Sequence, residues 1–313
     1  MSGVTSSHSY IRWPFIDAMR GVAIIAMIGF HFTWDLGFFQ LISYDIAFTP
    51  EGRLLSHLIA GSFLFLVGVS LSLAHRNGFD ARGFLIRFAK IAGAAALVSL
   101  GTFFAMPEDW IFFGVLHCIA LSSLLALPFL RAPLLLVGVS TLIVLAAPRV
   151  ISHPFFDQSS LFWLGLNKVL PRTNDYVPFF PWFGIVLAGL IAGRLMLAMP
   201  HLASWGARSI NSAVPRFLVR LGRYALPIYL LHQPIMMALL WAFVSVAGPS
   251  LITPAIEPAF FENCTQSCAA SGRSSEICQN ACSCLGRTLS SMKAQGDEAI
   301  QSALAICRKE GAF

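Results

Sequence analysis

Charged residues are scarce in this sequence. Only 12% of its 313 residues are Asp, Glu, Lys or Arg, while 57% are hydrophobic and the mean hydropathy is +0.72. A soluble enzyme carries a much larger share of charge, so this composition excludes that class and indicates a polytopic membrane protein whose partners include membrane lipids. The basic residues behind the net charge of +6 cluster in particular loops. We therefore interpret them as a topology signal and expect no nucleic-acid partner.

Two further features are missing. No short apolar core followed by a small-residue cleavage site occurs near the start, so we expect no cleavable signal peptide and assign residues 1–13 to a cytoplasmic N-terminal segment. No internal repeat is evident, which argues against a secondary transporter.

Apolar runs long enough to cross a bilayer dominate residues 14–248. They predict an all-α membrane bundle of about seven transmembrane helices, with the two termini on opposite sides. Arg and Lys concentrate in the loops on the amino-terminal side, which places the N-terminus in the cytoplasm and the C-terminus in the periplasm or outside the cell. The expected location is the inner (plasma) membrane. The seven predicted spans are 14–39, 55–75, 86–106, 110–130, 132–148, 177–198 and 224–247.

The remaining segment, residues 249–313, is a polar, cysteine-rich tail. Its spacing of C-x3-C, nine residues and C-x3-C places each pair on one face of a helix, similar to a twin C-x3-C helical hairpin. Two antiparallel helices could be joined as Cys264 to Cys282 and Cys268 to Cys278, leaving Cys284 for Cys307, although six cysteines allow about fifteen pairings. Disulfides indicate an oxidising compartment. A zinc site is the alternative, weakened because the tail has no histidine.

The first span contains four ionisable residues: Asp17, Arg20, His31 and Asp35. At about 100° per residue they fall on one side of a helix, so they must face a protein interior or an aqueous cavity. Ionisable groups at membrane depth are costly and indicate a functional site. The alternative is a pair of end charges that extend to the interface plus one structural histidine.

Histidines recur at the middle and outer levels of the predicted bundle. The helical rise places His31 about 25 Å above the cytoplasmic start of its span, with His57, His117 and His232 at middle or outer depth. Histidine titrates near neutral pH and is the natural acid or base in such a layer. We predict His31, with Asp35 and His57, as catalytic. His117 and His232 are predicted substrate contacts, and each could equally be structural.

Basic residues gather near the cytoplasmic face instead. Arg20, Arg194 and Arg223 lie low in the predicted spans, with Asp17 beside Arg20. A guanidinium binds phosphate oxygens through two parallel hydrogen bonds, so these residues are predicted to bind a phosphorylated cofactor; orienting the chain is their simpler role.

The outer side offers two further features. Trp182, in the segment DYVPFFPWFG, is a predicted substrate contact or an ordinary interfacial anchor. The loop from Val150 to Tyr176 is long enough to form a lid or an acceptor-binding surface.

Five segments occur in order between about Phe15 and Ala242: IDAMRGVAIIAMIGFHFTWDLGFF, AGSFLFLVGVSLSLA, FGVLHCIALSSLL, DYVPFFPWFGIVLAGLIAGR and LGRYALPIYLLHQP. In that order they resemble the catalytic domain of the heparan-alpha-glucosaminide N-acetyltransferase family and its bacterial relatives within the transmembrane acyltransferase superfamily.

The resemblance implies acyl transfer from cytoplasmic acetyl-CoA to a sugar or glycan acceptor on the far side of the membrane. Asp17 and Arg20 match the family's Asp and Arg of the first helix, and His31 stands where the lysosomal enzyme has an active-site asparagine. The family's catalytic histidine lies in the following lumenal loop, for which His57 is the nearest match. The cysteine-rich tail has no counterpart in the family.

Two other classes of function stay open. A transporter or lipid flippase would use the buried ionisable residues as a permeation path. A noncatalytic scaffold would bind a periplasmic protein through its tail, and a homo-oligomer is compatible with any of these functions.

Overall fold

The computed structural model describes residues 13–39, 41–42, 49–199, 212–247, 258–291 and 297–309. Of the predicted N-terminal segment, only Trp13 lies within these ranges. Residues 249–257 of the predicted tail lie outside them. Within the described ranges the regular structure is helical, with no β-strand and one isolated bridge, between Phe113 and Tyr176.

Each predicted span overlaps an apolar helix. Over the described residues, five helices are long and apolar enough to cross a membrane, namely α1, α2, α3, α6 and α9, while α4 and α5 are shorter. Large apolar side chains such as Leu135 and Phe104 remain 80% and 75% exposed on the helix surfaces, as expected for side chains that face lipid. The α-helices of the membrane part are α1 (Pro14–Phe38), α2 (Pro50–Ala74), α3 (Ala81–Ala105), α4 (Val115–Leu125), α5 (Leu134–Val150), α6 (Phe179–Ala198), α8 (Ala213–Arg223) and α9 (Ala225–Ala247).

The predicted span 110–130 forms a shorter helix than expected. Residues just before α4 are extended, because Phe113 bridges Tyr176 and its carbonyl accepts a hydrogen bond from the Val177 N–H at 3.2 Å. After α4 the chain continues as a short 3-10 helix, Leu127–Leu130, with proline in its first turn. The apolar run 110–130 therefore contains the helix α4 and, before it, an extended segment that pairs with the loop residue Tyr176.

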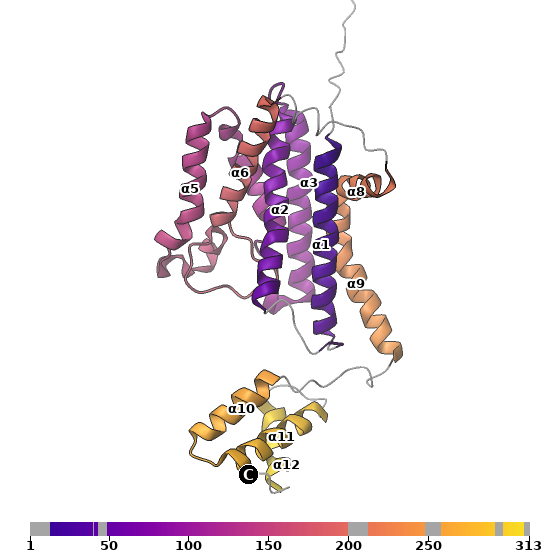
Figure 1. Cartoon of the computed structure of the whole chain (residues 1–313), viewed down its shortest axis with the longest axis vertical. Coiled ribbons are helices and arrows are strands. Elements are labelled where there is room, and N and C mark those ends of the chain that lie inside the picture. The colour runs from indigo at the N-terminus through magenta and orange to yellow at the C-terminus, as the bar shows by residue number, and fades with distance from the viewer. Residues whose placement is uncertain are drawn as a thin grey trace, which may run out of the picture. The chain divides into compact units, whose positions relative to one another are not determined.

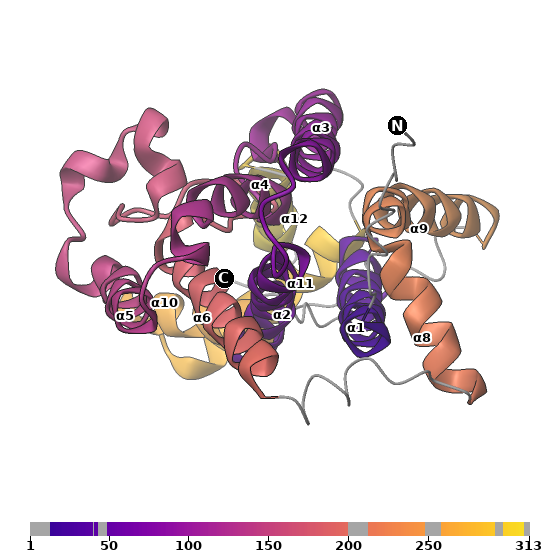
Figure 2. The same ribbon diagram turned by 90° about the horizontal axis from the view of Figure 1, so that it is seen from above.

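The chain divides into two compact units. One contains Met1–His31 and Pro50–Ile235, and the other contains Phe32–Thr49 and Met236–Phe313. Within the first unit, Figures 1 and 2 show α2 between α6 and α1, with α3 and α4 along a third side. Helix α5 packs against α6, and α8 runs across the direction of the other helices beside α1 and α9 (Figure 2).

Glycines allow α2 and α6 to approach closely. A Cβ atom on Gly68 would overlap the Val186 carbonyl oxygen, and one on Gly189 would overlap the Phe65 carbonyl oxygen. Ser72 Oγ donates to the Leu190 carbonyl oxygen across the same interface at 2.9 Å. Small residues commonly bring membrane helices together in this way, because close backbone contact maximises packing where hydrophobic burial supplies little.

The tail helices belong to the second unit and are held together by three disulfides. Helix α10 (Pro258–Ala270) is joined to α11 (Ser275–Ser291) by Cys264–Cys282 and Cys268–Cys278, and Cys284 joins α11 to Cys307 of α12 (Asp297–Lys309). This is the pairing that the spacing made possible. The six cysteines are consumed as disulfides in this structure, which leaves no thiolate for the alternative zinc site. The domain boundary at residue 248 stays a prediction.

Candidate active site

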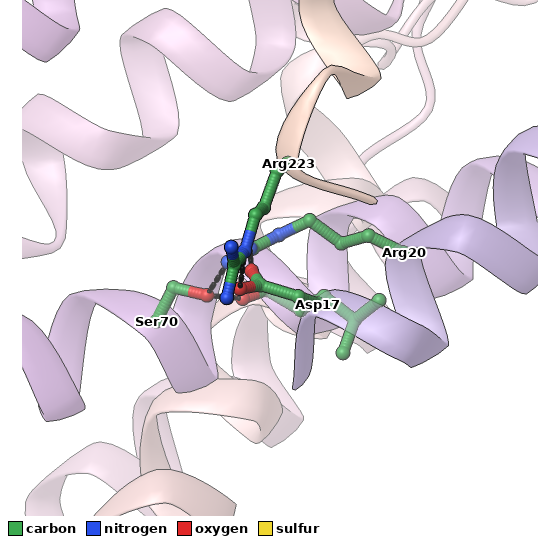
Figure 3. Close-up of polar contacts among 5 residues, drawn as sticks. Asp17, Arg20, Ser70 and Arg223 are labelled. Carbon is green, nitrogen blue, oxygen red and sulfur yellow. Dashed lines mark hydrogen bonds and ion pairs between the residues drawn. The ribbon is translucent and has the colours of Figure 1, made fainter. Parts of the chain in front are cut away.

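An ion cluster joins α1, α2 and α8 (Figure 3). Asp17 Oδ1 accepts a hydrogen bond from Arg20 Nη1 at 2.7 Å, and Asp17 Oδ2 lies 3.7 Å from Arg223 Nε. Arg20 Nη2 donates to Ser70 Oγ on α2. The Asp17 side chain is only 13% exposed, so its charge is largely removed from water. Among the residues that the structure describes, one carboxylate therefore contacts two guanidinium groups.

Backbone contact between α1 and α8 brings Arg223 to this cluster. A Cβ atom on Gly222 would overlap the Asp17 carbonyl oxygen, and one on Gly21 would overlap the Leu218 carbonyl oxygen. The neighbouring Arg223 therefore reaches Asp17, although the two residues are far apart in the sequence.

Asp17→Asn is expected to lower the free energy of unfolding by about 1–3 kcal/mol, because two guanidinium groups lose a partly buried charged partner. The measurement is thermal or denaturant unfolding of the detergent-solubilised protein. The matched control is Glu108→Gln, which removes a carboxylate 3.7 Å from Arg172 where both side chains are more than 70% exposed. That change is expected to have almost no effect. Equal losses in both variants would contradict a structural role for the Asp17 cluster.

Two histidines lie side by side within the bundle. The ring centroids of His31 on α1 and His232 on α9 are 5.0 Å apart, with an angle of 61° between the rings. His232 Nδ1 lies 2.7 Å from the Tyr229 carbonyl oxygen. Because a carbonyl can only accept, Nδ1 carries the hydrogen and Nε2 of the neutral ring is a proton acceptor. His232 Nε2 is buried and has no hydrogen-bond partner within the described residues, so it can accept a hydrogen bond.

His117 has a different environment. Its Nδ1 accepts a hydrogen bond from the Gly114 N–H at 3.2 Å, which caps α4, and its Nε2 lies 3.0 Å from Ser99 Oγ. Ser99 in turn donates to the Ile111 carbonyl oxygen at 2.6 Å. Both ring nitrogens of His117 are thus occupied, and the predicted substrate contact would require this capping network to open.

His57 and Trp182, both predicted site residues, contact each other separately from the His31–His232 pair. The His57 ring on α2 packs against Trp182 on α6, with ring centroids 5.6 Å apart. Asp35 is completely buried and belongs to the second compact unit. That Asp35 acts together with His31 in catalysis stays a prediction.

Arg194 is not part of the Asp17 cluster. Its Nη1 donates to the carbonyl oxygens of Phe129 and Ala132, in the connection between α4 and α5. The arginines that the sequence grouped by depth are therefore divided between two places in the bundle.

The loop between α5 and α6 is linked to the histidine pair, which the sequence did not predict. Asp175 Oδ2 accepts a hydrogen bond from the Val115 N–H at 3.0 Å, and its carboxylate also accepts from the Tyr229 hydroxyl. Burial raises the pKa of Asp175 above its usual value, and these two hydrogen bonds oppose that rise. The Tyr229 carbonyl oxygen accepts from His232, so Tyr229 connects the loop to the ring. The only sequence signal was the position of Tyr229 one turn before His232.

The fold and the site define an integral membrane protein whose helical bundle contains ionisable side chains, with a histidine pair and separate groups of arginines. Within the described residues, no cluster of His, Cys, Asp or Glu could hold a metal ion.

Residues 12–234 match the family described as "Heparan-alpha-glucosaminide N-acetyltransferase, catalytic". This match covers more than half of the chain, so the protein belongs to that family, as the resemblance of its motifs predicted. Membership indicates a transmembrane acetyltransferase. No curated protein and no solved structure matches the chain.

Proposed function

We propose that this protein transfers an acetyl group from cytoplasmic acetyl-CoA to a hydroxyl or amine of a sugar on the outer side of the membrane. The observation that carries the proposal is the His31–His232 pair, with ring centroids 5.0 Å apart inside a membrane bundle. The buried His232 Nε2, which has no partner among the described residues, lies on the ring beside His31, and an imidazole in such a pair suits proton removal from an acceptor. Family membership supports acetyl transfer as the reaction.

In the proposed reaction, His31 takes the proton of the acceptor hydroxyl or amine as its oxygen or nitrogen bonds to the thioester carbonyl carbon. Collapse of the resulting oxyanion breaks the carbon–sulfur bond, and the CoA sulfur leaves with the electron pair. The protonated His31 then returns the proton to that sulfur, so the products are the acetylated sugar and free CoA. General-base assistance of this kind contributes about 10² to 10⁴ in rate.

The neighbouring side chains have supporting roles in this proposal. His232 donates its Nδ1 hydrogen to Tyr229, so it can stabilise the oxyanion through Nε2 only as an imidazolium. Asp35, one turn after His31, would orient the imidazole or stabilise its cation. His57 and Trp182, which pack together, would contact the acceptor, with His57 as a second base.

The donor would be held at the opposite end. Arg20 and Arg223 both contact Asp17, which keeps the two guanidinium groups in place, and guanidinium groups bind phosphate oxygens through paired hydrogen bonds. Arg194 would contribute from its separate position. The predicted cytoplasmic N-terminus puts these arginines on the side where acetyl-CoA occurs, and the disulfides of the tail favour an oxidising outer compartment.

The test uses the purified full-length protein in sealed vesicles, with radiolabelled acetyl-CoA supplied on one side and a panel of sugars on the other. We expect label on a sugar in the compartment opposite to the donor, accompanied by release of free CoA. Solute movement without thioester consumption would instead identify a transporter or flippase. A scaffold would show neither activity and would lose a periplasmic partner when the tail is deleted.

A further inference from the structure

A second group of basic side chains lines a cavity of about 310 Å³ in the first compact unit. The end of α2 and the turn after it provide His75 and Arg76, the connection between α4 and α5 provides Arg131, and α6 provides Arg194. Among the described residues that line the cavity, none is acidic. Three arginines therefore line this space, with no carboxylate among the described lining residues.

Two of these arginines have no protein partner among the described residues. Arg76 and Arg131 make no hydrogen bond or ion pair in the part of the chain that the structure describes. Arg194 uses Nη1 to donate to the Phe129 and Ala132 carbonyl oxygens, which fixes its guanidinium and leaves its other N–H groups available. Arg131 is exposed to solvent, and Arg76 and Arg194 are partly exposed. Like charges around one cavity repel one another, so an anion bound among them would be stabilised.

His75 adds an incomplete hydrogen-bonding group. Its ring stacks on Phe79, with ring centroids 5.1 Å apart, and its Nδ1 lies 2.9 Å from the Leu71 carbonyl oxygen. Nδ1 must therefore be the donor, and Nε2 is the free nitrogen. Nε2 is buried and has no partner among the described residues. Buried polar atoms are nearly always paired, so this nitrogen also indicates a missing ligand.

We propose that this cavity binds a phosphate monoester or a diphosphate. Phosphate oxygens accept paired hydrogen bonds from guanidinium groups, and a doubly charged anion would offset most of the charge of the three arginines. The volume reaches the lower end of the range of small-molecule sites, roughly 300–1,000 Å³. The phosphate could belong to a soluble nucleotide-like molecule or to the headgroup of an anionic phospholipid. Arg194 also belongs to the proposed acetyl-CoA site, but phosphate binding in the cavity does not depend on acetyl transfer.

The test compares two double variants of the full-length protein in nanodiscs made of phosphatidylcholine. Arg76→Gln with Arg131→Gln removes the two unpaired arginines of the cavity. Arg82→Gln with Arg87→Gln removes the same charge from exposed positions on α3 that do not line it. The soluble arm measures binding of adenosine 3′,5′-bisphosphate and inorganic pyrophosphate by calorimetry. The lipid arm measures retention of added phosphatidic acid by native mass spectrometry.

We expect the cavity variant to lose about tenfold or more in affinity per arginine in at least one arm, and the α3 variant to resemble the wild type. Loss in the soluble arm identifies a nucleotide-like ligand, and loss confined to the lipid arm identifies a headgroup. A third variant, Arg76→Lys with Arg131→Lys, should bind with intermediate affinity. The proposal is overturned if no probe binds the wild type, or if both glutamine variants bind equally. Acetyl transfer is measured separately, as label on the sugar, so a cavity variant that loses phosphate binding but keeps transfer separates the two proposals.

Discussion

His31→Gln is expected to lower the rate of acetyl transfer by about 10² to 10⁴, because the reaction loses its general base while the side chain keeps a similar size. The measurement is label transferred to the sugar per unit time at saturating acetyl-CoA. His31 and His232 are expected to act as a unit, so the double variant with His232→Gln should lose little more activity than the worse single variant.

The control is His153→Gln in the loop between α5 and α6, where the ring accepts a hydrogen bond from the Phe155 N–H at 3.1 Å. That variant should keep its activity, and both single variants should unfold at temperatures close to the wild type. A correctly folded His31→Gln protein with full activity would remove His31 from the mechanism and leave His57 or His232 as the base.

Gly68→Ala and Gly189→Ala are each expected to lower the free energy of unfolding by about 1–3 kcal/mol or more. At both positions a Cβ atom would overlap a backbone carbonyl oxygen of the facing helix, and a backbone cannot move aside as a flexible side chain can. The α2–α6 interface would therefore have to separate. The measurement is unfolding of the purified protein in detergent, followed by fluorescence or circular dichroism.

The matched controls are Gly93→Ala and Gly101→Ala on α3, where a Cβ atom would meet nothing within 4 Å. Alanine favours the helix over glycine by about 1 kcal/mol, so the controls should be neutral or slightly more stable. Losses of similar size at Gly68 and Gly93 would show that helix propensity, not interhelical contact, sets the response.

The sequence predicted the spans well because each span is a local property. A long apolar run must be helical in lipid, where its backbone groups can find partners only within the helix. The exception is 110–130. Its start is extended because Phe113 pairs with Tyr176, and no periodicity within the run reports a partner that far along the chain.

The site was predictable only in part. Helical periodicity placed Asp17 next to Arg20, and the ion pair between them is present. Depth along the helices placed Arg194 with Arg223, but depth does not determine which side of the bundle a residue faces. The structure assigns Arg223 to the Asp17 cluster and Arg194 to a separate cavity.

By itself, the sequence determined the membrane class, most of the helices and the family, because these follow from local composition and ordered motifs, and its cysteine spacing made the observed disulfide pairing one of several possible ones. The tertiary structure alone decided which distant side chains meet. His31 contacts His232, and Tyr229 connects Asp175 to that pair, through helices brought together along the chain. The physical reason is that interhelical packing depends on close backbone contacts, such as those of Gly68 and Gly189, whose partners only the folded bundle specifies.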